Sequence, residues 1–218
     1  MHFSVRPTRF PGSAAKGLLW VATLALITVR LGHAAPSAPE ITVAAYYYPC
    51  EHPDPRWDKA KYPGFTEWDL IRRAKPRFPG HKQPKVPLWG YTDESDPKVM
   101  ARKIDAAANY GVNAFIFDWY YYDDGPYLQR ALEQGFLQAT NNNRLKFSLM
   151  WANHDWFDIQ GYNPADKIKL LYPGKVTPAT WDKITDLVIA RYFKHPSYWK
   201  IDGQPYFSMD YVPGRQLA

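Results

Sequence analysis

Polar side chains gather where apolar segments of this sequence end. Asp118 lies inside the apolar run FIFDWYY, where a carboxylate is costly unless it is paired or faces a polar cavity. Asn153, His154 and Asp155 follow a second apolar run, KFSLMWA. Both runs also carry aromatic rings. Sugars suit this mixture, because their C–H faces stack on aromatic rings and their hydroxyls need paired donors and acceptors.

The long segment from 49 to 96 adds Glu67 and Trp68 in GFTEW, since loops of this length are usually functional. Asp118 and Glu67 are the candidates for a catalytic carboxyl group. Each also has a structural interpretation: a salt bridge for Asp118, and the first turn of a short helix for Glu67. We expect nine side chains to form one substrate-binding surface: Tyr47, Glu67, Trp68, Asp118, Trp119, Trp151, Asn153, His154 and Asp155.

Other chemistries have weaker support in the sequence. His154-Asp155 suits acid–base chemistry, but no second His lies at helix or strand spacing, so we expect no metal. Cys50 is the only cysteine, which excludes a disulfide scaffold and a structural zinc site of several cysteines. No Gly-x-Gly-x-x-Gly or Walker-type loop follows a predicted strand, and we expect no cofactor.

Strands and helices must alternate to position these residues. Apolar, β-branched and aromatic runs predict buried strands over 41–48, 112–121, 146–153 and 204–211. Amphipathic patterns predict helices from Asp96-Pro97 to Gly111, from 126 to about 140, and from about 180 to 192. This order implies an α/β fold with a parallel sheet, either doubly wound or half of a (β/α)8 barrel. In both, ligands bind beyond the carboxyl ends of the strands.

The first 34 residues have the features of a secretory signal. Basic residues precede the apolar run GLLWVATLALITV (17–29), and small residues follow it. We expect cleavage near Ala34 or Ala35, which leaves a domain over 35–218 that is secreted or periplasmic and free of the membrane. An uncleaved anchor is the alternative. Cleavage of the signal removes most of the net charge of +6. The remaining domain has no basic stripe that would indicate nucleic-acid binding.

Four segments together resemble a known group of proteins: AAYYYP (44–49), GFTEWDLIRRAKPRFPGHKQPKVP (64–87), GVNAFIFDWYYYD (111–123) and LMWANHDW (149–156). Over about residues 41–211 the chain is similar to the glycoside hydrolase family 99-like proteins. These include the WbsX-type glycosyltransferases of polysaccharide gene clusters. The combination of GFTEW, KPRFPGHKQP and WANHDW is specific to that group.

The resemblance implies a (β/α)8 TIM barrel, of which this chain supplies the first four strands. It also implies a retaining glycosidase centre, which in the characterised members acts on α-mannosides inside a chain. There the two working glutamates lie in a motif like Asn-Glu-Trp-x-Glu-Gly late in the barrel. This chain lacks that motif, so we expect the paired glutamates beyond residue 218 and no activity in the chain alone. Relatives often have Asn-Glu-Asn at Asn153-His154-Asp155, which weakens any transfer of a substrate.

A secreted glycoside hydrolase acting on an oligosaccharide or polysaccharide is therefore the leading function. A glycosyltransferase of surface polysaccharide synthesis is the second, although export argues against it because nucleotide-sugar donors are cytosolic. A non-catalytic carbohydrate-binding protein that retains the aromatic cleft is the third.

Overall fold

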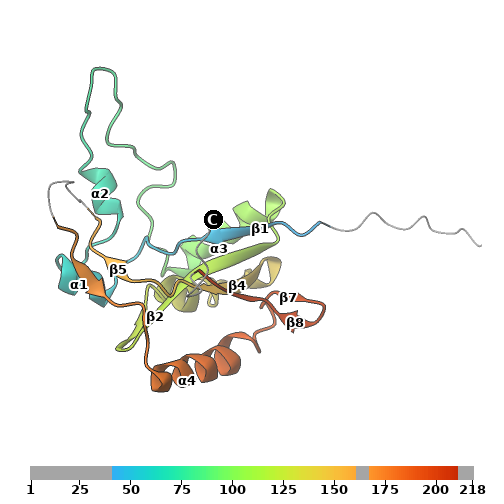
Figure 1. Cartoon of the computed structure of the whole chain (residues 1–218). Coiled ribbons are helices and arrows are strands. Elements are labelled where there is room, and N and C mark those ends of the chain that lie inside the picture. The colour runs from blue at the N-terminus through green and yellow to red at the C-terminus, as the bar shows by residue number, and fades with distance from the viewer. Residues whose placement is uncertain (1–40, 161–166, 211–218) are drawn as a thin grey trace, which may run out of the picture. The chain divides into compact units, whose positions relative to one another are not determined.

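Four parallel strands form the centre of the structure, a computed structural model that describes residues 41–160 and 167–210 (Figure 1). Their order across the sheet is β1 (Ala44–Tyr47), β2 (Ala114–Tyr122), β4 (Lys146–Trp151) and β9 (Phe207–Met209). Each strand lies beside the one that precedes it, so the sheet is wound in one direction. A doubly wound sheet reverses direction at its switch point. The described strands instead follow the winding of a (β/α)8 barrel.

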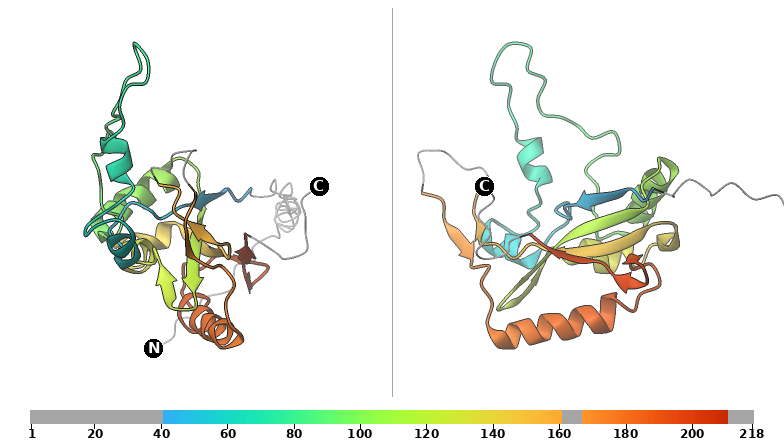
Figure 2. Two further views of the ribbon diagram at one scale, coloured as in Figure 1. Left: turned by 60° about the vertical axis from the view of Figure 1, so that its left-hand side comes forward. Right: turned by 45° about the vertical axis from the view of Figure 1, so that its right-hand side comes forward.

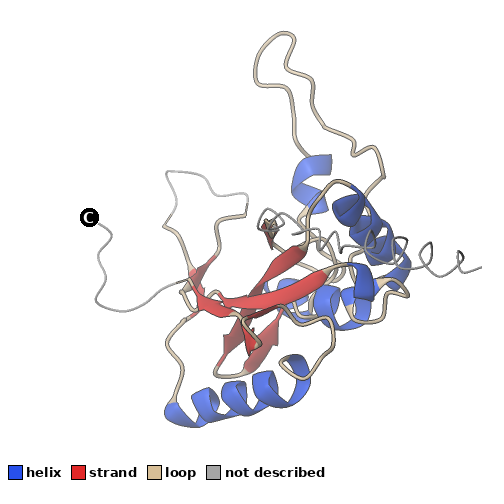
Figure 3. Ribbon diagram, turned by 90° about the vertical axis from the view of Figure 1, so that its right-hand side faces the viewer, coloured by secondary structure: helices blue, strands red, loops and turns tan. Residues whose placement is uncertain are grey.

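Helical segments connect the strands and pack against one face of the sheet. α3 (Pro97–Asn109) precedes β2. The π-helical segment η1 (Ala131–Phe136) and the 3-10 turn η2 (Asn142–Arg144) precede β4. α4 (Pro178–Leu187) and the π-helical segment η3 (Val188–Tyr192) precede β9. Figure 3 shows α4 running alongside the strands.

Alternation along the strands separates two faces of the sheet. Odd-numbered side chains such as Phe115, Phe117 and Phe147 pack against the helices, where they meet Met100 of α3 and Tyr192 of η3. The registers pair even-numbered residues with even-numbered residues across all four strands. The even-numbered side chains therefore share the opposite face, which becomes the interior when such a sheet closes. We call it the inner face.

Short elements occupy the connections beyond the strand ends. They are α1 (Pro55–Ala60), α2 (Trp68–Arg72), the two-stranded sheets β5 (Trp156–Phe157) with β6 (Leu170–Tyr172) and β7 (Lys200–Ile201) with β8 (Gln204–Pro205), and β3 (Gly125–Tyr127). An aromatic cluster holds α1 and β3 together. Trp156 stacks on Tyr127 at 4.2 Å between ring centroids and meets Trp57 edge-on at 4.8 Å. These aromatic rings thus serve packing.

The predicted start and end of the helix at 96–111 are confirmed. Asp96 accepts a hydrogen bond from the Lys98 amide at 2.8 Å, and Pro97 occupies the first helical position. Gly111 follows the helix with φ of +87°, a conformation that glycine adopts without steric cost. The last predicted helix also forms, but it begins at Pro178 because Thr177 accepts a hydrogen bond from the Thr180 amide.

The prediction of a helix from residue 126 is wrong at its start. Gly125–Tyr127 form β3, which pairs antiparallel with the end of β2 through Tyr122 and Gly125. Arg56 stabilises this turn, because its guanidinium donates to both Asp124 oxygens and to the Gly125 carbonyl. The predicted strand 204–211 is also divided, into β8 and β9. The expected signal segment 1–34 and Tyr211 lie outside the described residues. Within the described ranges, no helix combines the length and apolarity that crossing a bilayer requires.

Candidate functional site

The carboxyl ends of the strands bring polar side chains together on the inner face. Asp118 and Tyr120 belong to β2, His154 follows β4, and Asp210 follows β9. His154 Nε2 lies 4.0 Å from Asp210 Oδ2, and the His154 ring lies 6.0 Å from the Tyr120 ring. We call six residues the mouth cluster: Tyr48, Glu67, Asp118, Tyr120, His154 and Asp210.

Glu67 joins the mouth cluster through Tyr48. The Tyr48 hydroxyl donates to Glu67 Oε1 at 2.8 Å, and Gln160 Nε2 donates to the same oxygen at 3.0 Å. The Tyr48 ring lies 6.4 Å from that of Tyr120. Glu67 precedes α2, but its side chain makes no capping hydrogen bond to that helix. The structural interpretation is correct about position, since Glu67 is the N-cap residue of α2. The carboxylate itself is directed toward the ends of β1 and β2.

Asp118 is a half-buried carboxyl group without a cationic side chain against it. Its Oδ1 is buried and has no hydrogen-bond partner among the described residues. No Lys or Arg in that part of the chain lies within salt-bridge distance, so the salt-bridge interpretation fails. Burial raises the pKa of Asp118, and the nearby Asp210 raises it further while His154 opposes the shift. A carboxyl group with a raised pKa is suited to donate a proton or a hydrogen bond to a ligand.

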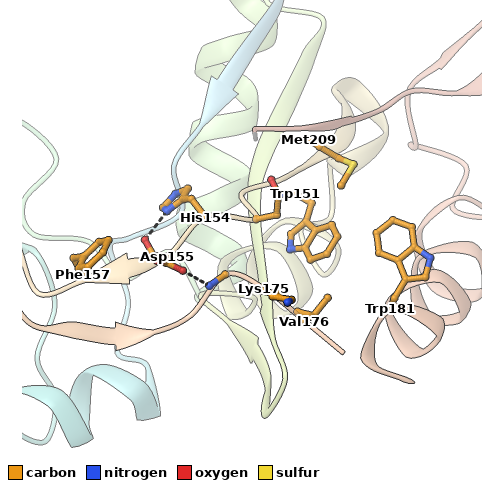
Figure 4. A pocket seen from close by; sticks show the side chains of 10 residues that line it. Trp151, His154, Asp155, Phe157, Lys175, Val176, Trp181 and Met209 are labelled. Carbon is orange, nitrogen blue, oxygen red and sulfur yellow. Dashed lines mark hydrogen bonds between the residues drawn. The ribbon is translucent and has the colours of Figure 1, made fainter. Parts of the chain in front are cut away.

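A cleft of about 940 Å³ extends from His154 toward α4 (Figure 4). Trp151 and Trp181 lie on one side of it, with ring centroids 5.4 Å apart. Asp155 lies at the rim, where its Oδ1 accepts a hydrogen bond from the Gly174 amide at 2.7 Å. His154 is common to the cleft and the mouth cluster, although Trp151, Met209 and Trp181 of α4 line the cleft from the helix side of the sheet. The lining residues of the cleft are Trp151, Asn153, His154, Asp155, Phe157, Gly174, Lys175, Val176, Trp181 and Met209.

The structure brings six of the nine predicted residues to the mouth cluster or the cleft: Glu67, Asp118, Trp151, Asn153, His154 and Asp155. The expectation of convergence is wrong for the other three. Tyr47 points to the helix side, where its hydroxyl donates to Glu94 and its ring stacks on Phe115. Trp119 is 2% exposed and packs there as well. Trp68 closes the base of a loop, since its Nε1 donates to the Thr92 carbonyl at 2.8 Å.

Tyr48, Tyr120 and Asp210 belong to the mouth cluster but are not among the nine predicted residues. The signal for Tyr120 was the strand period of two, which places it on the same face as Asp118. The signal for Tyr48 was weaker, because the register between β1 and β2 decides which tyrosine faces inward. Among the described residues, no three His, Cys, Asp or Glu side chains are grouped as a metal site requires.

Residues 43–215 match the family described as glycosyltransferase WbsX. The chain belongs to the WbsX family. Two uncharacterized WxcX proteins, from two strains of Xanthomonas campestris pv. campestris, are each 31% identical over 206 residues. The alignments cover 93% of this chain but 27% of those proteins, so the chain spans about a quarter of their length.

Solved structures with partial similarity are those of the GH99 endo-alpha-mannosidase from Bacteroides thetaiotaomicron. One, in complex with Bis-Tris propane, has a TM-score of 0.46 and 14% identity over 77% of this chain and 41% of that chain. The other has a TM-score of 0.45 and 15% identity over 77% and 44% of the two chains. The WbsX match spans every residue of the mouth cluster, from Tyr48 to Asp210.

In this WbsX domain, Asp118→Asn is expected to raise the melting temperature at pH 7 by about 2–4 °C. The folded pKa of Asp118 is raised, so the charged form is less favourable in the folded than in the unfolded state. This cost is present above the folded pKa and disappears below the unfolded value of about 3.9. Calorimetry across this pH range should therefore show the stabilisation shrinking as the pH falls.

Asp123→Asn is the matched control for this substitution and should have the opposite effect. Asp123 is exposed, and the Thr177 amide donates to its carboxylate at 2.8 Å, which lowers its pKa. Its charged form is thus favoured in the folded state, and Asp123→Asn should lower the melting temperature at pH 7. A loss of stability in Asp118→Asn at pH 7 would show that the Asp118 carboxylate is paired.

Proposed function

We propose that the mouth cluster binds a sugar residue of an oligosaccharide or polysaccharide and that the protein is a glycoside hydrolase. Membership of the WbsX family identifies a carbohydrate-active protein. The hydrolase proposal is supported by Asp118, whose unpartnered carboxyl oxygen and raised pKa suit donation to a glycosidic or hydroxyl oxygen. The exposed ring of Tyr48, which lies 6.4 Å from the Tyr120 ring, offers a stacking surface for a pyranose.

Glycoside hydrolysis normally uses two carboxyl groups that flank one bond, one as acid and one as nucleophile or base. In the proposed arrangement Asp118 and Glu67 contact the sugar, and Glu67 accepts hydrogen bonds. The paired glutamates that cleave the bond come from a part of the protein beyond residue 218. The coverage of 27% of the curated relatives supports this proposal of an incomplete barrel.

Asp118→Asn in the longer gene product is expected to lower kcat/KM on a polysaccharide substrate by about tenfold or more, because it removes a hydrogen bond between the Asp118 carboxyl group and the sugar. α-Mannan and mixed polysaccharides should be assayed by release of reducing ends. Asp123→Asn is the control, because that carboxylate contacts Thr177 outside the mouth cluster. The 218-residue chain alone should show no turnover. If the chain alone cleaves a glycoside at a rate that Asp118→Asn abolishes, the catalytic acids lie among the described residues.

A glycosyltransferase is the second candidate, because that is the description of the WbsX family. The same assay distinguishes the two functions. A hydrolase releases reducing ends from the polymer without a donor, whereas a transferase consumes an activated sugar and lengthens an acceptor. Donor-dependent elongation without release of reducing ends would replace the hydrolase proposal.

We also propose that the protein is exported through cleavage of its N-terminal signal. The basic region followed by GLLWVATLALITV supports this proposal. N-terminal sequencing of the protein recovered outside the cytoplasm is expected to begin near Ala35. A recovered product that still carries Met1 would exclude cleavage.

A further inference from the structure

An exposed loop over residues 73–92 rises from α2 and returns to the start of α3 (Figures 1 and 2). We call it the arm. It carries five basic residues and no Asp or Glu. All five basic side chains are exposed, and none has an ion-pair partner within the described ranges: Arg73, Lys75, Arg77, Lys82 and Lys85. The arm is therefore a concentrated and uncompensated positive charge.

Contacts with α2 hold the returning leg of the arm, and contacts within the arm hold its turn. The Tyr91 ring lies 5.4 Å from the Trp68 ring and 4.3 Å from the Arg72 guanidinium. At the turn, the His81 amide donates to the Phe78 carbonyl at 3.1 Å, and the two rings stack at 4.6 Å. Phe78 is nevertheless 61% exposed. The arm thus presents an aromatic ring among basic side chains, a combination that stacks on sugar rings and attracts anions.

The base of the arm adjoins the mouth cluster, which has the opposite charge. Glu67 immediately precedes α2, from which the arm rises. Asp210 adds a second carboxyl group to this negative charge, with His154 Nε2 4.0 Å from it. An anionic sugar is repelled at the mouth and attracted by the arm. A polymer avoids the repulsion at the mouth and gains the attraction of the arm when a neutral sugar residue lies at the mouth and its acidic residues lie along the arm.

We propose that the arm binds the anionic sugar residues of an acidic polysaccharide, such as a polymer containing uronic acids, while a neutral residue occupies the mouth cluster. The proposal rests on the proposed function, because it takes the mouth as the place where a glycan is bound. It adds the chemical class of the substrate and a site outside the mouth.

An anionic membrane surface is the other partner that basic and apolar side chains attract. The distribution of apolar groups on the arm favours the polysaccharide. The most exposed aliphatic side chains, Val86 and Leu88, lie on the returning leg, after the turn at 78–81. The residues that follow that turn, Lys82 and Gln83, are polar. The arm therefore lacks the continuous apolar face with which an interfacial segment enters a bilayer.

The test compares the full-length protein with the charge-reversal variant Lys82→Glu/Lys85→Glu. The control is Lys183→Glu/Lys194→Glu, which reverses two exposed lysines on α4 and beside η3. Binding to polygalacturonate, to neutral mannan and to phosphatidylglycerol vesicles is measured at low and high salt. The arm variant is expected to bind polygalacturonate about tenfold more weakly than the control, with a smaller dependence on salt. Mannan binding should be equal in the two variants.

Equal binding of polygalacturonate by the arm variant and the control would overturn the proposal. Binding of the unsubstituted protein to the vesicles but not to polygalacturonate would also overturn it and assign the arm to a membrane surface. Melting temperatures of both variants are compared first, so that a folding defect is recognised. Binding is measured without turnover, so failure of the hydrolase assay leaves this result interpretable.

Discussion

Replacing Glu94 by leucine is expected to cost about 3–5 kcal/mol of unfolding free energy, as the breaking of a buried ion pair does. Glu94 is 2% exposed. Its Oε1 accepts hydrogen bonds from the Lys103 ammonium and the Tyr47 hydroxyl, and its Oε2 accepts from the Glu51 amide at 2.9 Å. Glu94→Leu leaves these donors without an acceptor on the helix side of the sheet. Urea unfolding of the variant measures the loss.

Two controls separate this buried pair from an ordinary ion pair. Glu94→Leu/Lys103→Met removes both charges and should be less destabilising than the sum of the two single substitutions. Arg144→Leu breaks an exposed pair with Asp105 and should cost less than about 1 kcal/mol. If Glu94→Leu and Arg144→Leu have similar effects, water compensates the lost partner at Glu94.

Gly174→Ala is expected to cost about 2–3 kcal/mol of stability, as overpacking against fixed neighbours does, and to disrupt the mouth cluster. A Cβ at position 174 would lie 2.3 Å from the His154 carbonyl carbon and 2.6 Å from the Asn153 carbonyl oxygen. Both are backbone atoms, so the segment after β4 must move. His154 then leaves its position beside Asp210 and Tyr120. Thermal unfolding and the binding of an oligosaccharide measure the two effects.

Lys175→Ala is the control for the glycine substitution. It changes the adjacent exposed side chain without adding an atom toward the backbone of Asn153 and His154. It should leave stability nearly unchanged. Glycan binding that persists in folded Gly174→Ala would show that the position of His154 does not matter for the ligand.

The sequence predicted the elements whose cause is local. The strands around Phe117 and Leu149 are rich in apolar and aromatic residues, and a pattern of this kind is favourable only when both faces of a strand are covered. Asp96-Pro97 and Gly111 bound α3 because capping and left-handed backbone are properties of those residues themselves. The sequence also predicted which end of the sheet carries the polar side chains, because the carboxyl ends of parallel strands lie at the same edge.

Only the tertiary structure decides which face of the sheet each side chain occupies and which residues far apart in the sequence come into contact. A shift of one residue moves a side chain through the sheet, so the pairing of β1 with β2 alone places Tyr48, and not Tyr47, beside Glu67. The contact between His154 and Asp210 likewise depends on the pairing of β4 with β9. More than 50 residues, including α4, separate these two strands in the sequence. Local sequence carries periodicity and caps, whereas register and long-range pairing are set by how the whole sheet packs against its helices.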